Sequence, residues 1–204
     1  LTVTGVQTCA LPIYNTQHTD ERTELHWAVM SGDYQTTLDL IETGSDVNAC
    51  DEGGWTPLIT ASSAGYSHIV DALLEAGAKA SCKTKENRTA FFYAVSKCQI
   101  KVIDLFLQNG ICNWDKDVNG MSPLHRAVSN PKCTVEMLQM LKENDAPFDI
   151  KDSEGNLPIH IAAYEGRKDL VEWMDKNTKY GKRYSKNDEG KFPYQLFPSE
   201  EFNA

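Results

Sequence analysis

The sequence predicts an all-α repeat protein, an elongated solenoid of about five to six helix-turn-helix units with β-hairpin fingers. Two observations predict this fold class: a seven-residue phrase returns at nearly constant spacing, and the residues after it have the apolar spacing of a second helix. The longest apolar runs fall well short of the ~18 residues that a membrane span needs, so we expect no membrane association.

The repeated phrase reads RTELHWA, WTPLITA, RTAFFYA, MSPLHRA and NLPIHIA, with a divergent sixth copy, KFPYQLF. Successive copies begin 33, 33, 33, 35 and 35 residues apart. A period of 33 residues is that of the ankyrin unit. We therefore expect an ankyrin-repeat domain over residues 14–204, with repeats starting near residues 19, 52, 85, 118 and 153 and a partial repeat near residue 188.

Each phrase contains the signals that start a first helix. Thr or Ser stands at the second position in four of the five regular copies, where a hydroxyl can cap the helix, and Pro stands at the third position in three of them. Gly54 and its counterparts just before the phrase tolerate the positive φ of a tight turn, and Gly77 and Gly110 end second helices. The pattern predicts five helix pairs, with fingers at residues 15–23, 48–56, 81–89, 114–122 and 149–157.

One histidine position recurs in the phrase, at His26, His125 and His160. We expect these side chains to be structural, each a neutral imidazole that bridges backbone groups of adjacent fingers. Cys98 and Cys133 fall near the position where other repeats have glycine, so we interpret them as loop substitutions rather than nucleophiles.

Residues 1–13 carry no charge and match nothing downstream. The segment TGVQTCALPI resembles the translated read-through of a sequencing adapter, so we expect a non-native leader without packing partners. A signal peptide is the competing interpretation, but it requires positive charge before its apolar run. On this interpretation the natural N-terminus, with an earlier repeat, is missing.

The sequence lacks the signatures of catalysis and of metal binding. Its six cysteines have no C-x-x-C spacing and favour free thiols, and no glycine-rich phosphate loop follows a predicted strand. Acidic pairs such as Asp51 and Glu52 are expected on exposed fingers, with no apolar pocket to raise a carboxyl pKa. We expect a non-enzymatic chain with no cofactor and no metal. A net charge of −9 argues against nucleic-acid binding.

Charge is distributed unevenly along the repeats. Residues 14–78 contain eleven acidic residues and one basic residue, whereas residues 79–204 contain eighteen acidic and nineteen basic residues. Asp20, Glu21, Asp51 and Glu52 place part of this acidity on the first fingers. The excess negative charge therefore belongs to the first two repeats.

A column of lysines marks the later repeats. The residue just before the finger turn is Cys50 in one repeat and Lys83, Lys116, Lys151 and Lys186 in the next four. Two interpretations stay open: a solvated surface aligned by chance, or a bipolar groove. Such a groove would dock, in one orientation, a partner with a basic patch near repeats one and two and an acidic patch near repeats three to five.

Two tryptophans lie among these charges. We expect Trp55 on an exposed finger tip, where it would anchor a partner. Trp27 follows the histidine of the first phrase and is either a second anchor or packed between repeats.

The segments RTELHWAVMSG, GGWTPLITASSAGYSHIVDALLEAGA, FFYAVSK and SPLHRAV resemble the gankyrin family of ankyrin-repeat chaperones, which act on the base of the proteasome regulatory particle. The resemblance covers about residues 19–175. It implies an assembly chaperone that binds the C-terminal domain of a proteasomal ATPase subunit on its concave face. It places these residues against the partner: Asp20, Arg22, Trp27, Glu52, Trp55, Lys83, Arg88, Lys116 and Arg126. The charge pattern adds Asp51 and Lys151.

The chain departs from the family in two ways. Repeats four and five carry two-residue insertions, around residues 130–133 and 176–181, and an L-x-C-x-E docking motif for tumour suppressors is missing. We expect a monomer in the cytoplasm and nucleus. The alternatives are an adaptor of another class, such as a cyclin-dependent-kinase inhibitor or a ubiquitin-ligase substrate receptor, and the ankyrin part of a larger enzyme or channel.

Overall fold

The computed structural model describes residues 21–179 and 185–198. The described residues form five helix pairs and one 3-10 turn. The helices are α1 (Glu24–Ser31), α2 (Tyr34–Glu42), α3 (Pro57–Ala64), α4 (Ser67–Glu75), α5 (Ala90–Ser96), α6 (Ile100–Gln108), α7 (Pro123–Val128), α8 (Val135–Glu143), α9 (Pro158–Tyr164), α10 (Lys168–Asn177) and the turn η1 (Pro193–Gln195). The five predicted pairs are confirmed, and η1 occupies the place of the partial sixth repeat.

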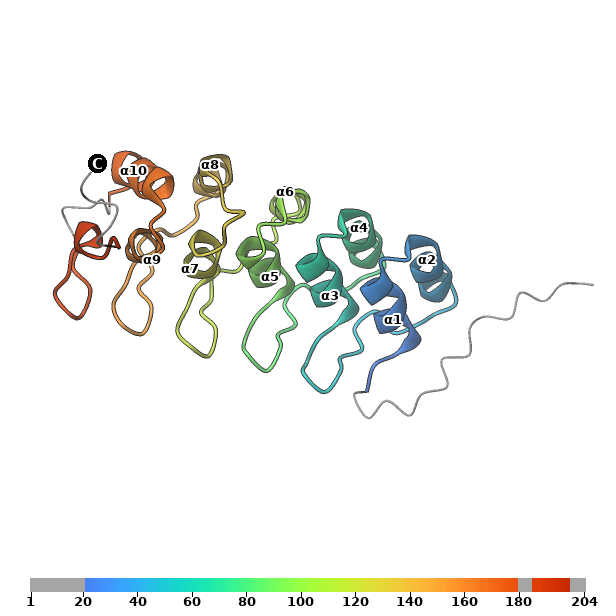
Figure 1. Cartoon of the computed structure of the whole chain (residues 1–204). Coiled ribbons are helices and arrows are strands. Elements are labelled where there is room, and N and C mark those ends of the chain that lie inside the picture. Colours follow the sequence, from blue (N-terminus) through green and yellow to red (C-terminus); the bar gives the residue numbers. More distant parts are fainter. Residues whose placement is uncertain (1–20, 180–184, 199–204) are drawn as a thin grey trace, which may run out of the picture.

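The repeats stack in single file (Figure 1). The odd-numbered helices form one row, the even-numbered helices form a second row, and the fingers project from the odd-numbered row. Each odd-numbered helix packs on the next one, as α1 does on α3 and α5 does on α7. This nearest-neighbour stacking is the solenoid that the period of the sequence predicts.

Local signals in the sequence set the helix starts. The Thr23, Thr56, Thr89 and Ser122 hydroxyls each accept a hydrogen bond from the backbone N–H three residues later. Leu157 has no hydroxyl, and α9 begins without a side-chain oxygen cap. The His160 Nδ1 accepts from the Leu157 N–H at 3.1 Å, as the Nδ1 atoms of His26 and His125 accept from the N–H groups of Thr23 and Ser122.

The fingers are hydrogen-bonded turns, and the described residues contain no assigned strand. In the second finger the Asp51 N–H donates to the Trp55 carbonyl at 2.9 Å, and Gly54 has a φ of 77°. A single bond, from the Lys85 N–H to the Gly53 carbonyl at 2.9 Å, joins this finger to the next. The prediction of β-hairpin fingers is corrected in one detail: the fingers are turns without strands, because isolated hydrogen bonds do not form the ladder of a β-sheet. Most of the first predicted finger, and all of residues 1–13, lie outside the described residues.

Two of the three recurring histidines, His26 and His125, have the predicted bridging role, whereas the Nε2 of His160 is a buried atom without a hydrogen-bond partner. The His26 Nε2 lies 3.0 Å from the Trp55 carbonyl, and the His125 Nε2 lies 2.9 Å from the Asn156 carbonyl. Because the His125 Nδ1 accepts from the Ser122 N–H, the proton of the neutral ring is assigned to Nε2. Burial lowers the pKa of His125, which favours this neutral form.

Candidate protein-binding face

An aspartate at the base of the finger organises three of the fingers. The Asp117 Oδ1 accepts from the N–H groups of Asn119 and Met121, each at 3.0 Å. Asp51 and Asp152 make the equivalent pair of bonds in their own fingers. Sequence reasoning missed this role, although the recurrence of Asp at one repeat position, as Asp51, Asp117 and Asp152, was a usable signal.

Asp51 is a structural residue, contrary to the expectation of an exposed acidic finger. It is only 7% exposed, and its Oδ2 accepts from the Arg22 Nε at 3.1 Å. The side chain turns inward because the N–H groups of the finger turn bind it, so its charge is neutralised locally. Glu52, the next residue, is exposed as expected, and Asp20 lies outside the described residues.

Asp117 binds two arginines through one oxygen. Its Oδ2 accepts from Arg88 Nη2 at 2.7 Å, from Arg88 Nε at 3.1 Å and from Arg126 Nη2 at 2.9 Å. Burial alone would raise the pKa of Asp117, but hydrogen bonds from Arg88, the Met121 N–H and Arg126 outweigh it and hold the pKa below its ordinary value. The carboxylate therefore stays ionised at neutral pH and holds both guanidinium groups in place.

Trp55 lies at the base of its finger, partly buried against the core, rather than on an exposed finger tip. Its ring packs on Tyr93 at a centroid distance of 4.5 Å. The indole of Trp55 packs on the apolar surface of Tyr93 instead of lying exposed on the finger. The sequence pattern did not indicate this contact. Trp27 is also partly buried, and the Arg22 guanidinium lies 5.5 Å from the centre of its ring.

A groove of about 640 Å³ runs over α5 between its neighbours α3 and α7. Its lining brings together three of the predicted site residues, Trp55, Arg88 and Arg126, and it also includes Tyr93, Glu86 and Lys97. The Arg88 guanidinium lies 5.4 Å from the ring centre of Phe92 and 5.9 Å from that of Tyr93. The groove, called the α5 groove below, therefore combines aromatic surface with cationic groups.

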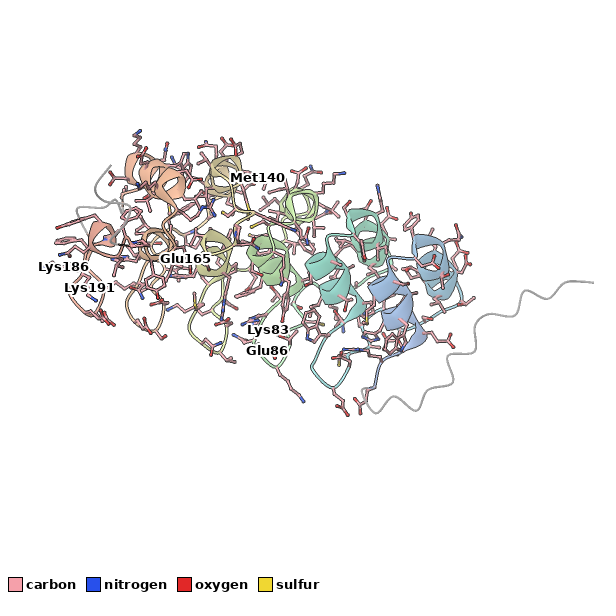
Figure 2. The ribbon with its side chains drawn as sticks, in the orientation of Figure 1. Lys83, Glu86, Met140, Glu165, Lys186 and Lys191 are labelled. Carbon is pink, nitrogen blue, oxygen red and sulfur yellow. The ribbon has the colours of Figure 1, made fainter. Side chains whose placement is uncertain are left out.

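The lysine column is exposed along the fingers, as predicted, at Lys83, Lys116, Lys151 and Lys186. Figure 2 shows Lys83 on the third finger and Lys186 at the far end of the row. Lys83 Nζ lies 3.0 Å from an Asp115 carboxylate oxygen, so part of its charge is compensated. The column therefore gives the later repeats an exposed cationic edge.

The described residues contain no group of three or more His, Cys, Asp or Glu side chains that is arranged to hold a metal. No helix in them has the length and apolar character to cross a bilayer. Five cysteines there are free thiols. Cys98 has a φ of 56° and takes the left-handed position that Gly32 and Gly65 occupy in earlier repeats, so its interpretation as a loop substitution is confirmed.

Comparison with known proteins identifies relatives for the whole repeat array. The family described as "Ankyrin repeats (3 copies)" matches residues 25–117 and 111–188. The Saccharomyces cerevisiae protein named "Probable 26S proteasome regulatory subunit p28" is 30% identical over 171 residues, which are 81% of this chain and 73% of that protein.

Two other relatives match over shorter parts of their length. The Dictyostelium discoideum protein named 26S proteasome non-ATPase regulatory subunit 10 is 48% identical over 60 residues, which are 29% of this chain and 26% of that protein. Inversin of Gallus gallus is 34% identical over 138 residues, which are 65% of this chain but only 12% of inversin. The similarity to inversin is thus confined to a small part of a much longer protein.

Proposed function

The chain belongs to the ankyrin-repeat family of protein-binding scaffolds, and on this premise we propose that it is an assembly chaperone of the base of the proteasome regulatory particle. The observation that carries the proposal is the similarity to yeast p28, which extends over 81% of this chain and 73% of that protein. A second relative, from Dictyostelium, is also named as a proteasome regulatory subunit.

We propose that the partner is the C-terminal domain of a proteasomal ATPase subunit and that it binds the face formed by the fingers and the odd-numbered helices. The supporting features are the exposed lysine column, the α5 groove and the exposed Glu52 on the second finger. Opposite charges at the two ends of this face would favour one orientation of the partner and accelerate its association.

The test is a binding measurement with the full chain. Purified C-terminal domains of the individual proteasomal ATPase subunits are passed over the immobilised chain, and one of them is expected to bind. Absence of binding to every subunit would contradict the proposal.

Capture from cell extract with mass spectrometry adds a second readout, in which cyclin-dependent kinases or a cullin scaffold would support the alternative adaptor function. Fluorescence imaging of the tagged chain tests the expected cytoplasmic and nuclear localisation.

A further inference from the structure

The α5 groove contains two buried polar atoms that have no hydrogen-bond partner. One is the Nε of Arg126, a donor, and the other is the Oε2 of Glu86, an acceptor. Both residues line the groove. A buried polar atom without a partner is costly, so a pair of opposite character in one groove indicates a ligand that supplies an acceptor and a donor together.

The charges around the α5 groove favour an anion as the acceptor. Arg88, Lys97 and Arg126 line it, with Glu86 as the one acidic residue of the lining. Asp117 binds Arg88 and Arg126 through a single oxygen, which leaves positive charge in excess. Asp117 binds Arg126 only through Nη2, so the Arg126 Nε–H can still donate to another group.

The aromatic residues of the groove indicate that the anion is attached to an apolar group. Trp55, Phe92 and Tyr93 contribute to the lining, and Phe92 and Tyr93 are almost fully buried. Apolar walls exclude water and strengthen the attraction between a guanidinium and a carboxylate. The partly exposed ring of Trp55 also provides a surface for the methylene groups of a side chain or for an apolar neighbour in the partner's sequence.

We propose that the α5 groove is a recognition site for one acidic side chain of a protein partner. The carboxylate accepts from Arg126 Nε, and a backbone N–H of the same segment donates to Glu86 Oε2. A phosphorylated side chain offers the same acceptor chemistry, but its second negative charge is disfavoured beside Glu86. The proposal rests on the proposed function only in that the partner is a protein.

The first test follows the Arg126 Nε–H signal in nitrogen-proton spectra of the full chain. The probes are blocked tripeptides with the sequences Leu-Glu-Leu, Leu-Gln-Leu and Leu-phosphoserine-Leu. We expect the Leu-Glu-Leu peptide to move the signal downfield and to bind at least about tenfold more tightly than the glutamine peptide. An unmoved signal, or equal responses to glutamate and glutamine, overturns the proposal. Tighter binding of the phosphoserine peptide overturns the choice of a carboxylate.

The second test uses variants and the ATPase domains. Arg126→Lys keeps the charge and a donor for Asp117 but removes Nε. We expect this variant to bind the Leu-Glu-Leu peptide and the ATPase domain at least about tenfold more weakly than the unchanged chain does. Lys101→Met, which removes an exposed charge on α6, outside both the groove and the proposed binding face, is the matched control, with a change below about twofold.

The two tests separate the failure of this proposal from that of the proposed function. If no ATPase domain binds but the peptide responds, the α5 groove stands and the partner is a different protein. If an ATPase domain binds and Arg126→Lys leaves its affinity unchanged, the groove proposal is wrong and the proposed function stands.

Discussion

Arg88 donates two hydrogen bonds to the Asp117 carboxylate of the following repeat, at 2.7 and 3.1 Å. Arg22 and Asp51 make the same contact between the first and second repeats, through one bond of 3.1 Å. In both cases the arginine precedes a first helix and the aspartate organises the next finger. The pair therefore couples the geometry of adjacent repeats while it holds a guanidinium at the binding face.

Asp117→Asn tests the contribution of the two arginines. The amide can still accept the finger N–H bonds, but it loses the charge that binds Arg88 and Arg126. We expect the free energy of unfolding to fall by about 1–3 kcal/mol in urea denaturation. Asp152→Asn is the matched control, since Asp152 makes the same finger bonds and has no arginine partner among the described residues. Equal losses in the two variants would show that the arginines contribute nothing.

His125 makes the fold sensitive to acid. Because burial lowers the pKa of His125, the unfolded chain binds more protons than the folded chain below about pH 6.5, the ordinary histidine value. The free energy of unfolding should therefore fall as the pH drops from 7.5 to 5.5. His125→Gln, which can keep the capping contact with Ser122 without titrating, should reduce this pH dependence. The same pH slope in both proteins would rule out this role for His125.

Gly54→Val tests the second finger. Gly54 has a φ of 77°, and a Cβ there would lie 3.1 Å from the Lys83 carbonyl oxygen and 3.1 Å from the Thr84 Cα. We expect a loss of about 1–3 kcal/mol from backbone strain. Gly77→Val is the control, because Gly77 has a φ of 86° but nothing within 4 Å of its Cβ position. If thermal denaturation shows that Gly77→Val destabilises the chain as much as Gly54→Val does, the contact between fingers adds nothing to the cost of the backbone strain.

The bipolar docking model predicts the kinetics of charge reversal. Changing Asp20 and Glu52 to Lys together should slow association with the ATPase domain and flatten its salt dependence, since these charges act over a Debye length of about 8–10 Å. Asp71 and Glu75, both exposed on α4, give a control double reversal with the same change in net charge. Surface-plasmon kinetics at two salt concentrations provide the measurement. If reversal of Asp20 and Glu52 leaves the association rate and its salt dependence unchanged, the bipolar docking model is wrong and these acidic residues serve only solubility.

Trp55→Ala should act mainly on dissociation. The indole lies in the lining of the α5 groove and packs on Tyr93, so its removal deletes apolar contact area without changing long-range charge. We expect a dissociation rate at least about tenfold faster, with an association rate within about twofold. A slower association rate with normal dissociation would assign Trp55 to folding of the face rather than to contact with the partner.

Much of the fold could be predicted because its signals are local. The hydroxyl caps at Thr56 and Ser122 act over three residues, and the turn at Gly54 depends on the φ of one residue. The period places each local unit, and stacking follows because a single unit cannot bury its apolar face. The lysine column was predictable for the same reason, since equivalent positions in a solenoid share an edge.

The binding face needed contacts between repeats. Asp51 and Glu52 are adjacent acidic residues in the sequence, yet only Asp51 is buried, because Arg22 and the finger N–H groups bind it. Trp55 leaves the finger surface because Tyr93, in the next repeat, offers an aromatic face. The sequence by itself determined the repeat, its helix starts and its exposed lysine edge. Only the tertiary structure decided which charges are neutralised and which polar atoms of the α5 groove still lack a partner, because those outcomes depend on contacts between repeats, such as that of Arg88 with Asp117.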